Sequence, residues 1–109
     1  MSTLTDAVIA ELKQKNQGET LHKLVSDDKK YTIVIKAPNT HLWRNFRNHT
    51  SDPNLRAGAL AKLVETVMVW PEPVEWDRMV TERPGLSEAF GSEVVTIAGA
   101  NVNVESAKL

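Results

Sequence analysis

The chain has 109 residues, of which 41% are hydrophobic and 25% charged, and its formal net charge is −1. This length predicts one small domain with a single core, and the composition is typical of a soluble globular protein. The near-neutral charge provides no general attraction to nucleic acid or anionic membranes, and the lack of cysteine excludes disulfides and thiolate chemistry. No apolar run approaches the ~20 residues of a membrane span, and the N-terminal residues lack signal-peptide features, which favours a cytoplasmic location.

The N-terminal third is expected to form a helix followed by a β-hairpin. Thr5 can cap the helix and Gly18 ends it. Between residues 19 and 36 the apolar period changes to two, and the β-branched stretch Tyr31–Lys36 follows a polar turn. A lone hairpin is marginal in water, so one face is expected to lie on the helices. Val34 makes the second strand apolar on both faces, which is a modest indication of a further contact.

Residues 39–70 are expected to form two helices. Asn39 or Thr40 can cap the first, and Trp43 lies on its buried side together with neighbouring apolar residues. The second is expected to begin with Asp52 as its N-cap and Pro53 at its first position. Its buried face has three- and four-residue spacing, and Pro71 ends it. The residues of that face are Leu60, Leu63, Val64, Val67 and Met68.

Two further helices are expected after Pro71. Pro73 begins a short helix with Trp76 on its apolar side, and the Pro84-Gly85 turn ends it. The last helix follows and stops at Gly99, where a left-handed C-cap is expected.

These elements predict an α+β fold, mostly α, in which an N-terminal helix and a β-hairpin pack on a bundle of about four helices. Residues 1–99 are expected to form a single globular domain, with the hairpin at about 19–36 and the helices at about 39–99. Residues 100–109 are small and polar and show no helical period, so we expect a flexible C-terminal tail.

No arrangement of residues in the sequence indicates catalysis, a metal site or a cofactor. His22, His41 and His49 have spacings that match no compact metal motif. The acidic residues around Pro73 are better explained by the dipole of the helix that begins there. No serine lies in a nucleophile elbow, and the glycines form no phosphate-binding loop. The sequence therefore predicts a protein that is not an enzyme.

A basic strip with interleaved aromatic residues could in principle form a nucleic-acid surface. Against this interpretation, the aromatic residues also suit a core, and acidic residues lie in the same region. Nucleic-acid binding is therefore a minority hypothesis. The strip consists of Lys29, Lys30, Tyr31, Lys36, Trp43, Arg44, Phe46, Arg47 and Arg56.

The linear pattern as a whole resembles the small tail assembly chaperones of tailed bacteriophages and prophages. The resemblance covers roughly residues 19–99, from the hairpin to the final helix. Its strongest points are Leu63-Val64, Trp70-Pro71 and Pro84-Gly85-Leu86.

The resemblance implies a non-enzymatic role in the host cytoplasm. Such chaperones hold the aggregation-prone tape measure protein and contact tail tube subunits before the tail polymerises. In some relatives a ribosomal frameshift near the end of the gene adds a second domain. Reversible apolar contact with a helical client would suit this sequence, and self-association is also possible.

Apolar residues beyond the needs of one core indicate where a client could bind. Val69, Trp70, Val74 and Trp76 surround the Pro71-Glu72-Pro73 elbow, and elbows are usually accessible to solvent. The competing interpretation, that both tryptophans fill gaps between helices, is favoured by the frequent use of large aromatic residues in small cores.

Two other classes of function stay open. The chain could be a structural subunit of a phage tail or a related apparatus, using the strand Tyr31–Lys36 for edge-to-edge assembly. It could also be a small prophage protein that binds a host partner, because such a protein equally needs no catalytic group.

Overall fold

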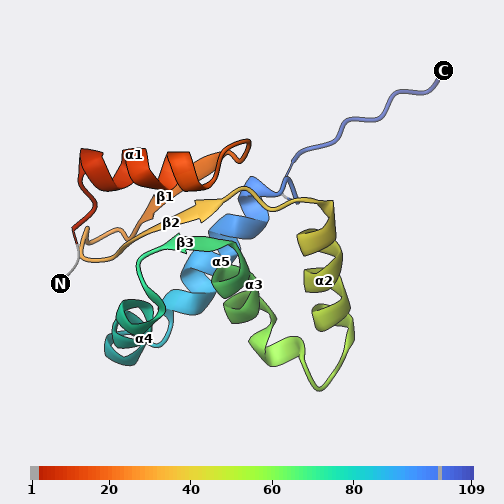
Figure 1. The fold of residues 1–109 in the computed structure, drawn as a ribbon. Helices are drawn as coiled ribbons and strands as arrows, with labels where there is room; N and C mark the ends of the chain where they lie inside the picture. The colour runs from red at the N-terminus through yellow and green to blue at the C-terminus, as the bar shows by residue number, and fades with distance from the viewer. Residues whose placement is uncertain (1–2, 101) are drawn as a thin grey trace.

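An antiparallel sheet of three strands crosses the middle of the structure, a computed structural model that describes residues 3–100 and 102–109 (Figure 1). The strands are β1 (Leu21–Val25), β2 (Thr32–Lys36) and β3 (Met68–Trp70), in the spatial order β1-β2-β3. The hairpin pairs β1 with β2, and β3 joins the other side of β2 from a point more than thirty residues later. The apolar strand β2 is therefore the central strand.

Helix α1 (Asp6–Lys15) covers one face of this sheet. The apolar stripe of α1 is narrow, and its buried residue is Leu12. Leu12 and Ile9 lie beside Leu21 and Val34, and Val34 is only 5% exposed. The two apolar faces of β2 are thus both covered from within the chain.

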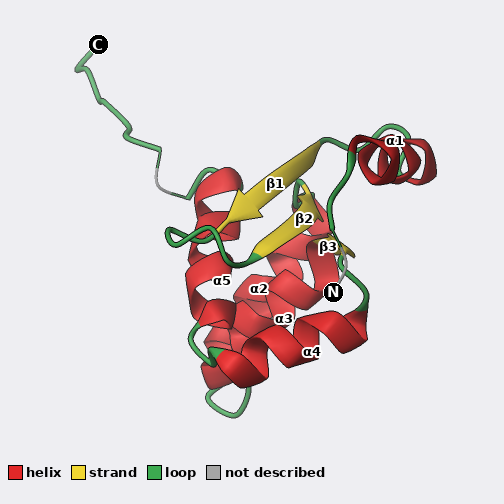
Figure 2. Ribbon diagram, turned by 90° about the vertical axis from the view of Figure 1, so that its left-hand side faces the viewer, coloured by secondary structure: helices red, strands yellow, loops and turns green. Residues whose placement is uncertain are grey.

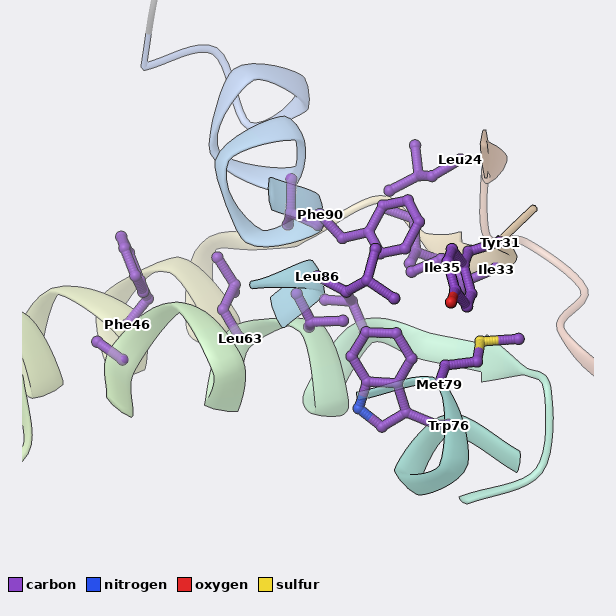
Figure 3. Packing of buried hydrophobic residues seen from close by; sticks show 14 residues of the cluster. Leu24, Tyr31, Ile33, Ile35, Phe46, Leu63, Trp76, Met79, Leu86 and Phe90 are labelled. Carbon is purple, nitrogen blue, oxygen red and sulfur yellow. The ribbon is translucent and has the colours of Figure 1, made fainter. Parts of the chain in front are cut away.

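The opposite face of the sheet lies on the helical bundle (Figure 2). Helices α3 (Ala59–Val67), α4 (Pro73–Glu82) and α5 (Leu86–Ile97) pack beneath the sheet, and α2 (Thr40–Ser51) packs on α3. A single cluster of buried residues joins these elements to the strands (Figure 3). Its members are Leu24, Tyr31, Ile33, Ile35, Phe46, Ala59, Leu63, Val64, Val67, Trp76, Met79, Leu86, Phe90 and Val94. The mostly α-helical α+β fold predicted from the sequence is confirmed.

The crossing of α3 and α5 is the most extensive contact between helices of the bundle. Gly91 of α5 lies directly against Leu60 of α3, and a Cβ atom built on Gly91 would stand 2.8 Å from the Leu60 Cβ. The absence of a side chain at position 91 therefore lets the two backbones approach.

Several predicted helix ends are confirmed in detail. The Thr5 hydroxyl accepts a hydrogen bond from the Val8 N–H at 3.2 Å, and Asn39 Oδ1 accepts one from the Leu42 N–H at 2.9 Å. Gly99 has φ +93°, and the Ala100 N–H donates to the Val95 carbonyl, as in a Schellman turn.

The predicted helix that begins after Asp52 and ends before Trp70 is wrong at both ends. Asp52 follows the end of α2, and its Oδ1 accepts a hydrogen bond from the Asn54 N–H at 2.9 Å, which makes a turn rather than a helix cap. A short 3-10 helix (Arg56–Gly58) precedes α3, which begins at Ala59. At the other end, residues 68–70 leave the helix and pair with β2.

Edge-to-edge assembly through Tyr31–Lys36 is also contradicted. This stretch contains β2, whose two sides are already paired with β1 and β3. β1 pairs along the whole of β2, and β3 pairs with it at Val34 and Ile35, so β2 is the central strand and the outer strands of the sheet are β1 and β3.

Residues 102–109 contain no helix or strand and extend from the end of α5, away from the bundle (Figure 2). Val102 and Val104 are 68% and 87% exposed. Over residues 3–100 and 102–109, none of the helices combines the length and the apolar character that a membrane crossing requires.

Candidate functional site

The structure separates the four residues that the sequence placed in one client-binding surface. Trp76 points into the core, where it is 3% exposed and its ring lies 6.1 Å from that of Phe90 (Figure 3). Val74, two positions earlier on α4, is 82% exposed. A client cannot contact Trp76 in the folded chain, so this residue is a core residue.

Val69 and Trp70 lie in β3, and both are half-buried. The pairing of β3 with β2 sets Trp70 opposite Val34 and Met68 opposite Ile35, so Val69 is an extra residue in a bulge. Residues directly opposite in an antiparallel pair project from the same face. Trp70 therefore lies on the outer face of the sheet, which α1 covers only in part.

Trp70 lines an open cleft of about 570 Å³ between this face, the segment that precedes α1, and α4. We call it the Trp70 cleft. Its apolar lining comes from Leu4, Trp70 and Met79, and the charged residues that line it are Lys23, Lys30, Glu75, Arg78 and Glu82.

The rim of the Trp70 cleft is held by a small polar network on α4. The Arg78 guanidinium contacts Glu82 Oε1 at 2.8 Å and Glu75 Oε1 at 3.3 Å. The Tyr31 hydroxyl donates to Glu82 Oε2 at 3.0 Å. Burial, together with the Glu82 hydrogen bond, raises the pKa of Tyr31 above its ordinary value. The network fixes the charged wall of the cleft and joins α4 to the beginning of β2.

A second polar contact joins the hairpin turn to the end of α4. Asp28 Oδ1 accepts a hydrogen bond from the Ser26 hydroxyl at 2.6 Å, and Asp28 Oδ2 contacts Arg83 Nη1 at 2.6 Å. The Ser26 hydrogen bond is the main cause that lowers the pKa of Asp28, and the Lys30 N–H and Arg83 contribute to it. Arg83 also lies 5.9 Å from the centre of the Tyr31 ring.

The residues described by the structure contain no group of three or more histidine and acidic side chains placed to hold a metal ion. His22 lies in β1, whereas His41 and His49 both lie in α2, and the His41 ring contacts the Asn45 side chain at 3.4 Å. The basic strip is likewise divided, because Tyr31 and Phe46 lie in the core while Arg44, Arg47 and Arg56 are exposed.

Sequence reasoning missed most of the Trp70 cleft. Leu4, Lys23 and Arg78 come from three elements that meet only because β3 joins β2 and α4 follows it. Without β3 in the predicted topology, no local pattern could bring these residues together.

Comparison with known proteins shows a similarity of fold with one solved structure. No protein-family model and no curated protein sequence matches the chain. A solved structure, that of the uncharacterised protein rbstp2171 from Bacillus stearothermophilus, is similar with a TM-score of 0.75 and 19% sequence identity. The similarity covers 91% of this chain and 99% of that one. The arrangement of helices and strands therefore occurs in a second protein, and this similarity is one of fold.

Proposed function

We propose that this protein is a non-enzymatic chaperone for tail assembly in tailed bacteriophages or prophages, acting in the bacterial cytoplasm. Its client would be the tape measure protein, and it would also contact tail tube subunits. The proposal is supported by the sequence resemblance over residues 19–99 and by one structural observation, the half-buried Trp70 in an open cleft.

The Trp70 cleft has the properties that a transient helical client requires. Its floor is apolar, whereas Arg78 and Glu82 on its wall are already paired with each other. A client helix could bury apolar side chains against Trp70 and Leu4 without leaving these charges unpaired. The exposed Val74 at the start of α4 offers a further apolar contact.

Co-expression with the tape measure protein encoded beside this gene tests the proposal. We expect the client to become soluble and to co-purify with the chain. Leu4→Asp and Val74→Asp should each reduce the recovered client, because a carboxylate would be buried in the contact. Leu55→Asp is the matched control, since Leu55 is an exposed apolar residue in the loop before α3.

The fold of each variant is checked by circular dichroism before binding is compared. A client that stays insoluble beside folded, monodisperse wild-type protein would contradict the chaperone function. Detection of this chain in purified tail particles by mass spectrometry would favour a structural subunit instead.

A further inference from the structure

A groove of about 620 Å³ lies along the outer edge of β1, where α5 passes beneath the sheet. Its floor is formed by Leu24, Leu86, Ala89 and Phe90, and we call it the β1 groove. It is separate from the Trp70 cleft, which lies on the other side of the sheet, although Lys23 borders both.

The outer side of β1 is open to a further strand. In the sheet order β1-β2-β3, and within residues 3–100 and 102–109, the backbone of β1 is paired with β2 on one side only. A free strand edge beside an apolar groove is the geometry of strand addition, in which an extended segment pairs with the edge and places alternate side chains in the groove. The β1 groove therefore fits an extended segment with apolar residues at every second position.

Residues 102–105 of this chain have that pattern. Val102 and Val104 alternate with Asn103 and Glu105, and both valines are β-branched. The structure leaves both valines largely exposed in an extended segment beyond α5. Residues 102–105 thus have the apolar alternation of a strand but are not part of the sheet, and the outer edge of β1 is available for a further strand.

Lys23 of β1 and Glu105 of the tail have opposite charges, and Asp28 on the groove rim is already paired with Arg83. Leu24 projects from β1 into the core, so its neighbour Lys23 projects from the opposite face of the sheet. If Val102 and Val104 project toward the groove, then Glu105 projects to the same side as Lys23. Pairing of two β1 strands lacks this complementarity, because it would bring two copies of Lys23 close together.

The course of the tail favours a second copy over the molecule's own tail. Residues 102–109 leave α5 in the direction away from the sheet (Figure 2). A molecule's own tail therefore points away from its β1 groove, whereas the tail of another copy can enter it.

We propose that residues 102–105 of one copy add as a fourth strand to β1 of a second copy, with Val102 and Val104 in its β1 groove. Reciprocal exchange would give a symmetric dimer in which each tail completes the partner's sheet. The occupant of the groove is thus this chain's own tail, donated between molecules.

Sedimentation equilibrium of the full chain over a range of concentrations measures the predicted dimer. Val102→Asp combined with Val104→Asp should raise the dimer Kd by about 100-fold, because two buried valines become carboxylates. Asn103→Asp with Ala107→Asp is the matched control, since it adds the same charge at positions that face away from the groove. Ala89→Arg should fill the groove and weaken the dimer at least about tenfold, whereas Ser92→Arg on the same helix should not.

Cysteine cross-linking identifies which molecule donates the strand. The chain has no cysteine of its own, so each disulfide that forms joins two introduced cysteines. Copies carrying Lys23→Cys are mixed with differently tagged copies carrying Glu105→Cys. Opposed residues on paired strands are within disulfide distance, so a cross-link between the two tags is expected. A protein that stays monomeric at all concentrations would overturn the proposal. So would a dimer unaffected by Ala89→Arg, or a cross-link that forms only when both cysteines are in one chain.

Discussion

Gly91→Ala tests the close crossing of α3 and α5 with a change of one methyl group. The new Cβ would stand 2.8 Å from the Leu60 Cβ, 3.1 Å from the Leu60 carbonyl oxygen and 3.2 Å from Leu60 Cδ2. Carbon atoms in contact prefer about 3.5–4.0 Å, so the first of these contacts is short by about 1 Å. The Leu60 Cβ and carbonyl are fixed to the backbone of α3, and rotation of the side chain cannot relieve them.

Two effects of opposite sign decide the change in stability. Alanine is favoured over glycine inside a helix by about 1 kcal/mol. Overpacking of a tight contact costs about 1–3 kcal/mol, and a contact with backbone-fixed atoms belongs at the upper end of that range. We therefore expect a net loss of about 2 kcal/mol in the free energy of unfolding, which corresponds to a fall in Tm of about 8 °C for a chain of this size.

Urea titration and thermal melting followed by circular dichroism measure this loss, with Gly85→Ala as the control. Gly85 has φ −73° and ψ −5°, which alanine adopts freely, and no atom lies within 4 Å of a Cβ built there. The control should gain about 0.4–1 kcal/mol because alanine restricts the unfolded chain. If Gly91→Ala also proved stabilising, the inference that α3 and α5 touch at this glycine would be refuted.

Three further substitutions test other parts of the structure. Asp28→Asn should lower stability at neutral pH. The folded-state pKa of Asp28 is lowered, so its contribution is present above the ordinary pKa of about 4 and is lost as the pH falls through the lower folded-state pKa. The urea midpoints of variant and wild type should therefore converge as the pH falls below about 4, and a difference independent of pH would contradict this. Lys29→Gly should stabilise the chain by about 1 kcal/mol, because Lys29 has φ +65°, and a lower urea midpoint would show that this conformation is not strained. Trp76→Ala should cost about 3–5 kcal/mol, whereas Val74→Ala on the exposed side of the same helix should change stability by less than about 0.5 kcal/mol. Equal effects of these two substitutions on the melting temperature would contradict the placement of Trp76 in the core.

Local signals in the sequence were sufficient for most elements. The caps at Thr5 and Asn39, the hairpin and the left-handed Gly99 follow from interactions between residues close in the sequence. Strand β3 does not, because its partner β2 lies more than thirty residues earlier. The apolar spacing that predicts helix α3 continues through Met68, so pairing with β2 overrides a helical pattern at that point.

The two tryptophans near the elbow show why the site was harder to predict than the fold. By pattern alone, Trp70 and Trp76 are equivalent large aromatic residues on either side of the Pro71-Glu72-Pro73 elbow. Their difference arises in three dimensions, because Trp70 shares the outer sheet face with Val34 while Trp76 points from α4 toward Phe90. The Asp52-Pro53 pair shows a related ambiguity, since the same residues that begin a helix elsewhere form a turn here.

The position of β3 has a consequence for synthesis on the ribosome. Residues 21–36 emerge first and can form only a two-stranded hairpin, which is marginally stable alone. The strand that completes the sheet and the helix α5 that covers it follow some thirty to sixty residues later. At elongation rates of about 5–20 residues per second this interval lasts several seconds, during which the face of β2 that α3 and α5 later cover has no helix on it. The nascent chain is therefore most prone to aggregation after β2 has been synthesised and before β3 and α5 have been added.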